Sequence, residues 1–126
     1  MEGEVSSMTV EECCVLQTIK ERLELILNRL DIKKSFDIRI HRHKTYTIDN
    51  KIIYLKLGCN GSIYDIDTLM KTGIHELTHV LNMSIHSNRT HDSQFVKLET
   101  IIEITAIILD LYDPTKLLMY EEKCPY

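Results

Sequence analysis

The sequence predicts one α+β domain in which an N-terminal helix leads into a three-stranded, mainly antiparallel sheet, followed by two further helices. Two kinds of hydrophobic pattern predict it. Apolar residues recur every three or four positions near the N-terminus and again in the second half, which is typical of amphipathic helices. Between residues 36 and 57 they alternate with polar residues, as in half-buried strands. We expect this domain to occupy residues 1–126, with its core at about 9–112.

The first helix should begin near residue 10 and extend to about residue 30. Thr9-Val10-Glu11-Glu12 has the form of a capping box, in which a Thr hydroxyl and a Glu carboxylate accept hydrogen bonds from free backbone N–H groups. An apolar stripe with spacings of three and four follows, formed by Leu16, Ile19, Leu23, Ile26 and Leu30.

Three strands are expected next, at residues 36–41, 45–49 and 52–57. The Asp49-Asn50 pair suits a tight turn between the second and third strands, because both residue types tolerate turn conformations. Residues 58–62 contain two glycines, an asparagine and a serine, and are expected to form a loop.

Two more helices complete the expected fold. The second should be capped by Asp65 or Asp67, and its buried stripe should consist of Met70, Ile74, Leu77 and Leu81. Gly73 in this helix either weakens it or permits close approach of a strand. The third should be capped by Thr90 or Asp92 and end at Asp113-Pro114, with a stripe of Phe95, Leu98, Ile102, Ala106 and Leu109. One more helical turn is expected around residues 116–120.

The second helix carries the run His75-Glu76-Leu77-Thr78-His79. Side chains four residues apart share one helix face, so the two imidazoles can bind one Zn²⁺. The intervening Glu76 can then reach a water molecule at that metal and act as a general base. The pattern therefore indicates a metal-dependent hydrolase of the HExxH type.

A catalytic zinc usually has three protein ligands and one open position. The sequence offers four candidates for the third ligand, namely His86, His91, Glu99 and Glu103. Residue 85, where metzincins carry their third histidine, is Ile85, which disfavours that class. Glu99 and Asp92 are alternatively expected to accept hydrogen bonds from the ligating imidazoles.

Several segments together suggest a family. They are the strand residues 53–57, the helical residues 68–74, the HExxH run itself, and the run His91-Asp92-Ser93-Gln94-Phe95. This combination resembles the WLM family of metalloproteases, which is related to the SprT/Spartan proteases, over about residues 36–112. The resemblance implies a small zincin-like (minigluzincin) fold, Zn²⁺ held by His75, His79 and His91, and Glu76 as the general base. It also implies protein substrates that are bound or crosslinked to DNA.

Charge and composition bear on partners and location. The segment 33–51 has six basic and two acidic residues, a charge of +4 in a chain of net charge −4, and could contact DNA. Alternatively, these basic residues could lie on a solvated sheet edge, where charged side chains discourage pairing with another strand. The acidic N-terminus does not resemble a signal peptide, and no apolar run is long enough for a membrane span. The four cysteines form no C-x-x-C pair, so reduced thiols in an intracellular, cytoplasmic or nuclear protein are expected.

Two other classes of function stay open. An inactive relative could keep zinc only for stability, as a binding module. A metal-dependent ribonuclease with three histidines is less favoured, because such enzymes place the third histidine close behind the second. For the hydrolase, the group that stabilises the oxyanion could be Tyr64, His86, Arg89 or Tyr112. The oligomeric state is left open.

Overall fold

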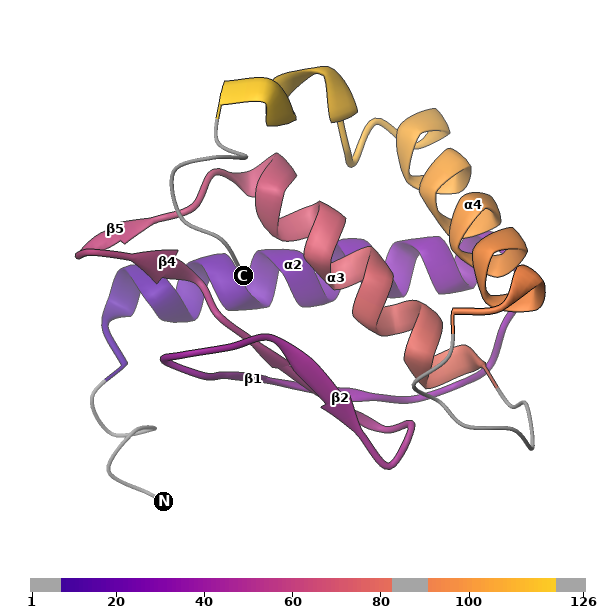
Figure 1. Cartoon of the computed structure of the whole chain (residues 1–126), viewed down its shortest axis with the longest axis horizontal. Helices are drawn as coiled ribbons and strands as arrows, with labels where there is room; N and C mark the ends of the chain where they lie inside the picture. The colour runs from indigo at the N-terminus through magenta and orange to yellow at the C-terminus, as the bar shows by residue number, and fades with distance from the viewer. Residues whose placement is uncertain (1–7, 83–90, 120–126) are drawn as a thin grey trace.

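The computed structural model describes residues 8–82 and 91–119 and has the expected α+β architecture (Figure 1). Its elements are α2 (Val10–Arg29), β1 (Asp37–Ile40), β2 (Tyr46–Ile48), β3 (Ile52–Leu55), β4 (Gly58–Cys59), β5 (Ser62–Ile63), α3 (Ile66–Leu81), α4 (Ser93–Ile108) and the 3-10 helix η1 (Pro114–Met119). The capping box is confirmed, because Thr9 and Glu12 each accept a hydrogen bond of 3.0 Å from the other's backbone N–H.

The sheet differs from the expected one in its strand order. β3 lies in the middle, paired parallel with β1 and antiparallel with β2, so the sheet is mixed and the expectation of a mainly antiparallel sheet is wrong. Asp49 and Asn50 form the expected tight turn, with φ of 57° and 50°, and this turn fixes only the β2–β3 pairing. Strand alternation does not specify which strands become neighbours, and here β1 joins the free edge of β3.

The expected loop at residues 58–62 is also corrected. Gly58–Cys59 pairs antiparallel with Ser62–Ile63, and the connecting Asn60 and Gly61 have φ of 55° and 83°. An Asn-Gly pair favours such a tight hairpin turn, because both residues tolerate positive φ. The strands are only two residues long and therefore too short to show an alternating pattern in the sequence.

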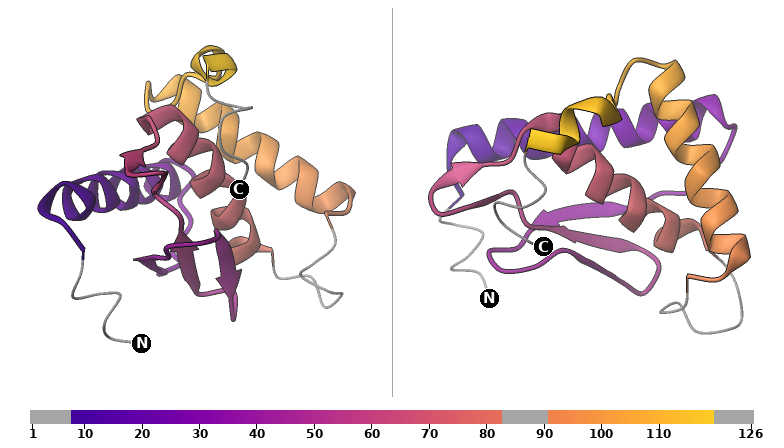
Figure 2. Two further views of the ribbon diagram at one scale, coloured as in Figure 1. Left: turned by 60° about the vertical axis from the view of Figure 1, so that its left-hand side comes forward. Right: turned by 45° about the horizontal axis from the view of Figure 1, so that its top comes forward.

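α2 and α3 cover the same face of the three-stranded sheet, and the other face carries no helix among the described residues (Figure 2). Ile38, Ile40, Ile53 and Leu55 point from the sheet into the core, where they meet the apolar stripes of both helices. At Gly73, an added Cβ would lie 3.4–3.8 Å from side chains of α2, so this glycine faces a helix rather than a strand. The core thus fixes α3 between the sheet and α2.

α4 packs on α3 through Phe95, Ile102 and Ala106, as its apolar spacing predicts. It ends at Ile108, before Asp113-Pro114, so the expected end at the proline is wrong. Asp110 adopts a φ of 61°, and the N–H of Leu111 donates to the carbonyl of Ala106. This is the hydrogen bond of a Schellman ending, which terminates the helix without proline.

The structure bears on two further expectations, about membrane-spanning helices and about the redox state of the cysteines. Among the residues described, no helix is both long and apolar enough to cross a bilayer. Cys13 and Cys14 are exposed free thiols, but Cys59 is disulfide-bonded, so the expectation of reduced cysteines is wrong for that residue. Spacing along the chain cannot show which thiols come within bonding distance, because that depends on the folded Cα positions.

Candidate metal centre

α3 is the element on which the site is built. Asp65 caps it by accepting a hydrogen bond from the N–H of Asp67, which decides between the two expected caps. His75 and His79 lie half-buried on one face of the helix, and their ring centroids are 5.1 Å apart. Because α3 packs against the sheet, α2 and α4, the two rings are held on a rigid support.

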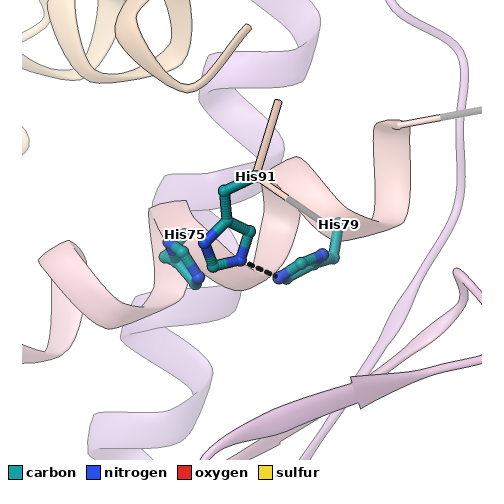
Figure 3. A group of neighbouring side chains, drawn as sticks. All are labelled: His75, His79 and His91. Atoms are coloured by element: carbon teal, nitrogen blue, oxygen red, sulfur yellow. Dashed lines mark hydrogen bonds between the residues drawn. The ribbon is translucent and has the colours of Figure 1, made fainter. Parts of the chain in front are cut away.

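A third imidazole joins them from the start of α4 (Figure 3). One ring nitrogen each of His75, His79 and His91 can be chosen so that all three lie within 4.8 Å of one another. The closest pair is Nε2 of His91 and Nε2 of His79, 3.3 Å apart. Three imidazole nitrogens at such separations could hold one metal ion.

The run His91-Asp92-Ser93-Gln94-Phe95 has a clear structural role. Asp92 caps α4 by accepting a hydrogen bond of 2.9 Å from the N–H of Phe95. The buried Phe95 ring stacks on His91 at 4.5 Å between centroids and also contacts His79 at 4.6 Å and His75 at 5.3 Å. The cap therefore directs the helix, and the phenyl ring supports all three imidazoles from behind.

Glu99, one of the candidate ligands, instead contacts the far side of His75. Its Oε2 lies 2.8 Å from Nδ1 of His75. A hydrogen bond there fixes the tautomer with the proton on Nδ1 and leaves Nε2 free for a metal. His86 lies outside the described residues, and Glu103 is not part of the cluster among those described.

Glu76 is buried beside the cluster, with 7% of its surface exposed. Burial raises the pKa of its carboxyl group above the ordinary value, while a hydrogen bond from Thr47 and the nearby His75 lower it. The Thr47 hydroxyl donates to Oε1 of Glu76 over 2.7 Å. Both residues therefore belong to the site, although the sequence pattern indicated only Glu76.

Asn50 is a second residue that sequence reasoning placed only in a turn. Its side-chain Nδ2 donates over 2.6 Å to the backbone carbonyl of His79, in the last turn of α3. Such carbonyls have no partner within the helix, so the amide satisfies one of them. The β2–β3 turn is thereby attached to the helix that carries the histidines.

The cluster opens into a hollow of about 380 Å³ between α3 and β2. Its wall consists of Thr45, Tyr46, Thr47, Asn50, His75, Glu76, His79 and His91. A second hollow of about 310 Å³ shares Thr45, His75 and Glu76 with it and extends toward Lys71, Thr72 and Glu99. His75 and Glu76 therefore line both hollows, whereas His79 and His91 line the larger one.

Of the four expected oxyanion-stabilising candidates, the two that the structure describes do not line these hollows. Tyr64 and Tyr112 line neither hollow, and Tyr112 is buried with 5% of its surface exposed. His86 and Arg89 lie outside the described residues. Tyr46, which the sequence pattern did not indicate, lines the larger hollow instead.

The basic segment 33–51 does not form one patch of unpaired charges. Arg42 pairs with Glu12 at 2.7 Å, and Arg39 pairs with Asp37 at 2.8 Å. On the uncovered face of the sheet, the rings of Tyr46 and Tyr54 stack at 4.9 Å, and His41 contacts both edge-on. Part of the segment's charge is therefore neutralised within the fold.

Comparison of the chain with family models, with curated proteins and with solved structures finds no match. The chemistry of the site must therefore be argued from its own residues.

Proposed function

We propose that this chain is a zinc-dependent metallopeptidase of the WLM and SprT-like kind, with a zincin-like fold. The observation that supports the proposal most is the convergence of His75, His79 and His91 on one point beside the buried carboxylate of Glu76. Two of these histidines come from α3, and the third lies just before the N-cap residue of α4. A chance HExxH run would not require a third imidazole from a separate element.

The donor set fits zinc. Three neutral imidazole nitrogens suit a divalent metal such as zinc, and three protein ligands leave a fourth position open, as in catalytic sites. His75, His79 and His91 would hold the ion, with Glu99 orienting His75 through Nδ1. Bound zinc would lower the pKa of a coordinated water molecule and polarise a substrate carbonyl.

Glu76 would move the proton in the reaction. Its carboxylate would accept a proton from the attacking water and then transfer it to the departing amine nitrogen, so that the peptide bond is replaced by a carboxylate and an amine. The cleft position supports this role, because Glu76 lines both hollows next to His75. Thr45, Tyr46 and Thr47 are the residues with hydroxyl groups in the wall of the larger hollow, so a hydroxyl donor for the oxyanion would come from β2 or the residue before it.

The edge strand β2 offers a way to bind a peptide. Within residues 8–82 and 91–119, β2 pairs with β3 on one side only, and two of its residues, Tyr46 and Thr47, line the larger hollow. An extended peptide can add to an exposed sheet edge through main-chain hydrogen bonds. A substrate aligned with β2 would then pass in front of the three histidines.

We further propose that the protein acts on proteins bound or crosslinked to DNA, with contacts from the segment 33–51. Lys44 and the aromatic rings of His41, Tyr46 and Tyr54 on the uncovered sheet face would be the contacting groups. Phosphate contacts make binding weaker as salt rises. If single-stranded and duplex DNA left both cleavage and thermal stability unchanged at low salt, this part of the proposal would be wrong.

The deciding experiment compares the wild type with Glu76→Gln and with a matched control on α4, Glu103→Gln. Zinc content measured by mass spectrometry should be one ion per chain in all three proteins. Cleavage of casein and of histones should be lost only in Glu76→Gln. Wild-type protein that binds zinc but cleaves neither substrate would favour the inactive binding module, and protein that binds no divalent metal would refute the proposal.

A further inference from the structure

Thr47, on β2, makes a side-chain hydrogen bond with the proposed general base. It lies on β2 opposite Ile53 of β3, and since Ile53 faces the core, the Thr47 side chain points to the same face, toward α3. Its hydroxyl donates to Oε1 of Glu76 at 2.7 Å. A polar side chain at an inward strand position calls for an explanation beyond core packing.

The hydrogen bond between Thr47 and Glu76 lies in a buried environment, where hydrogen bonds to a carboxylate are strong. Glu76 is 7% exposed, so its carboxylate has lost most of its water and depends on protein donors. Within residues 8–82 and 91–119, Thr47 supplies the side-chain hydrogen bond to this carboxylate. The bond occupies Oε1 and leaves Oε2 as the oxygen available to accept a proton.

The donor is itself held in place. Asn50, three residues further along, anchors the same hairpin to the carbonyl of His79 at 2.6 Å. The branched side chain of Thr47 has few allowed χ1 rotamers. The hydroxyl position relative to α3 is therefore set by the hairpin and not by the helix that carries Glu76.

We propose that Thr47 is a positioning residue, which holds the Glu76 carboxylate by Oε1 so that Oε2 faces the water to be deprotonated. This inference rests on the proposed peptidase function. It predicts that removal of the hydroxyl slows the chemical step and leaves metal and substrate binding intact, because Thr47 donates to the acid and not to a histidine ligand.

The test compares Thr47→Val, which keeps the shape and removes the hydroxyl, with Thr47→Ser, which keeps the hydroxyl. Thr18→Val on α2 is the control, because Thr18 also donates a hydroxyl hydrogen bond, to the carbonyl of Cys14, far from the cleft. For each protein, kcat, KM and zinc content are measured. The Glu76 carboxyl carbon resonance is also recorded by NMR in metal-free, ¹³C-glutamate-labelled protein, with Glu76→Gln used for its assignment.

We expect kcat of Thr47→Val to fall about 10- to 100-fold, the range that follows from losing one hydrogen bond to a charged group, with KM and zinc content unchanged. Thr47→Ser should retain kcat within about threefold of the wild type, and only Thr47→Val should shift the Glu76 resonance. The inference is overturned by a normal kcat in Thr47→Val, by an equal loss in Thr47→Ser, or by an unmoved resonance. If the wild type cleaves nothing, the proposed function fails first and this inference fails with it.

Discussion

The ligand set gives the sharpest prediction, because His91 and Glu99 have different places in the site. His91 lies within the triad, with Nε2 3.3 Å from that of His79, whereas Glu99 contacts only the Nδ1 side of His75 at 2.8 Å. Replacing His91 with alanine removes one of the three proposed metal-binding nitrogens. Replacing Glu99 with alanine removes a group that orients one of the others.

The expected losses follow from these positions. Four-ligand zinc sites bind with about 10–16 kcal/mol, so one ligand contributes about 2.5–4 kcal/mol, and His91→Ala should weaken zinc binding by about 60- to 1,000-fold. Removal of an orienting carboxylate costs about 10- to 100-fold, which is the range for Glu99→Ala. Glu99→Gln should lose less, because its carbonyl oxygen can still accept the hydrogen bond from Nδ1 of His75.

The assay is competition for zinc with a chromophoric chelator at one fixed neutral pH, since imidazole ligands must be deprotonated to bind. Glu103→Gln is the control for a change of charge on α4, because Glu103 is outside the cluster. The predicted order of affinity loss is His91→Ala, then Glu99→Ala, then Glu99→Gln. A larger loss in Glu99→Ala than in His91→Ala would refute the reasoning and make Glu99 the third ligand.

Three predictions concern stability and are read from unfolding curves. Gly73→Ala should raise the free energy of unfolding by up to about 1 kcal/mol, because alanine favours a helix and its Cβ would meet neighbours no closer than 3.4 Å. A lower free energy of unfolding would show that α2 cannot accommodate the methyl group. Ile102→Ala should lower the free energy of unfolding by about 2–5 kcal/mol, whereas Ile104→Ala should lower it by less than about 1 kcal/mol, because the two side chains are 0% and 50% exposed. Equal losses of stability would contradict the packing of α4. The pKa of the Glu12 carboxyl group is lowered from 4.5, chiefly by the hydrogen bond from Arg42. The ion pair therefore stabilises the fold at pH values above the pKa that Glu12 has in the unfolded chain. This stabilisation is lost as the pH falls through the lower pKa that Glu12 has in the folded protein. Arg42→Gln should therefore cost up to about 1 kcal/mol at neutral pH and almost nothing below that folded pKa, and a cost that did not depend on pH would argue against the pair.

Local pattern was sufficient to predict that the three helices exist and to indicate two of the site's groups, but it left two candidate caps each for α3 and α4 and placed the end of α4 too late. The caps at Thr9, Asp65 and Asp92 and the face shared by His75 and His79 depend on residues within about one helical turn of each other. A sequence displays such short-range relations directly. The HExxH run and the apolar stripes could therefore be recognised without coordinates.

Contacts between distant segments decided the rest. The parallel pairing of β1 with β3, the donation from Thr47 to Glu76, and the position of Glu99 behind His75 join residues that are 15 to 29 positions apart. No hydrophobic period encodes these pairings, because they arise only when the sheet and three helices bury their apolar faces together. That packing brings His91 to the other two imidazoles, and so it sets which of the described candidate side chains complete the cluster that could hold a metal ion.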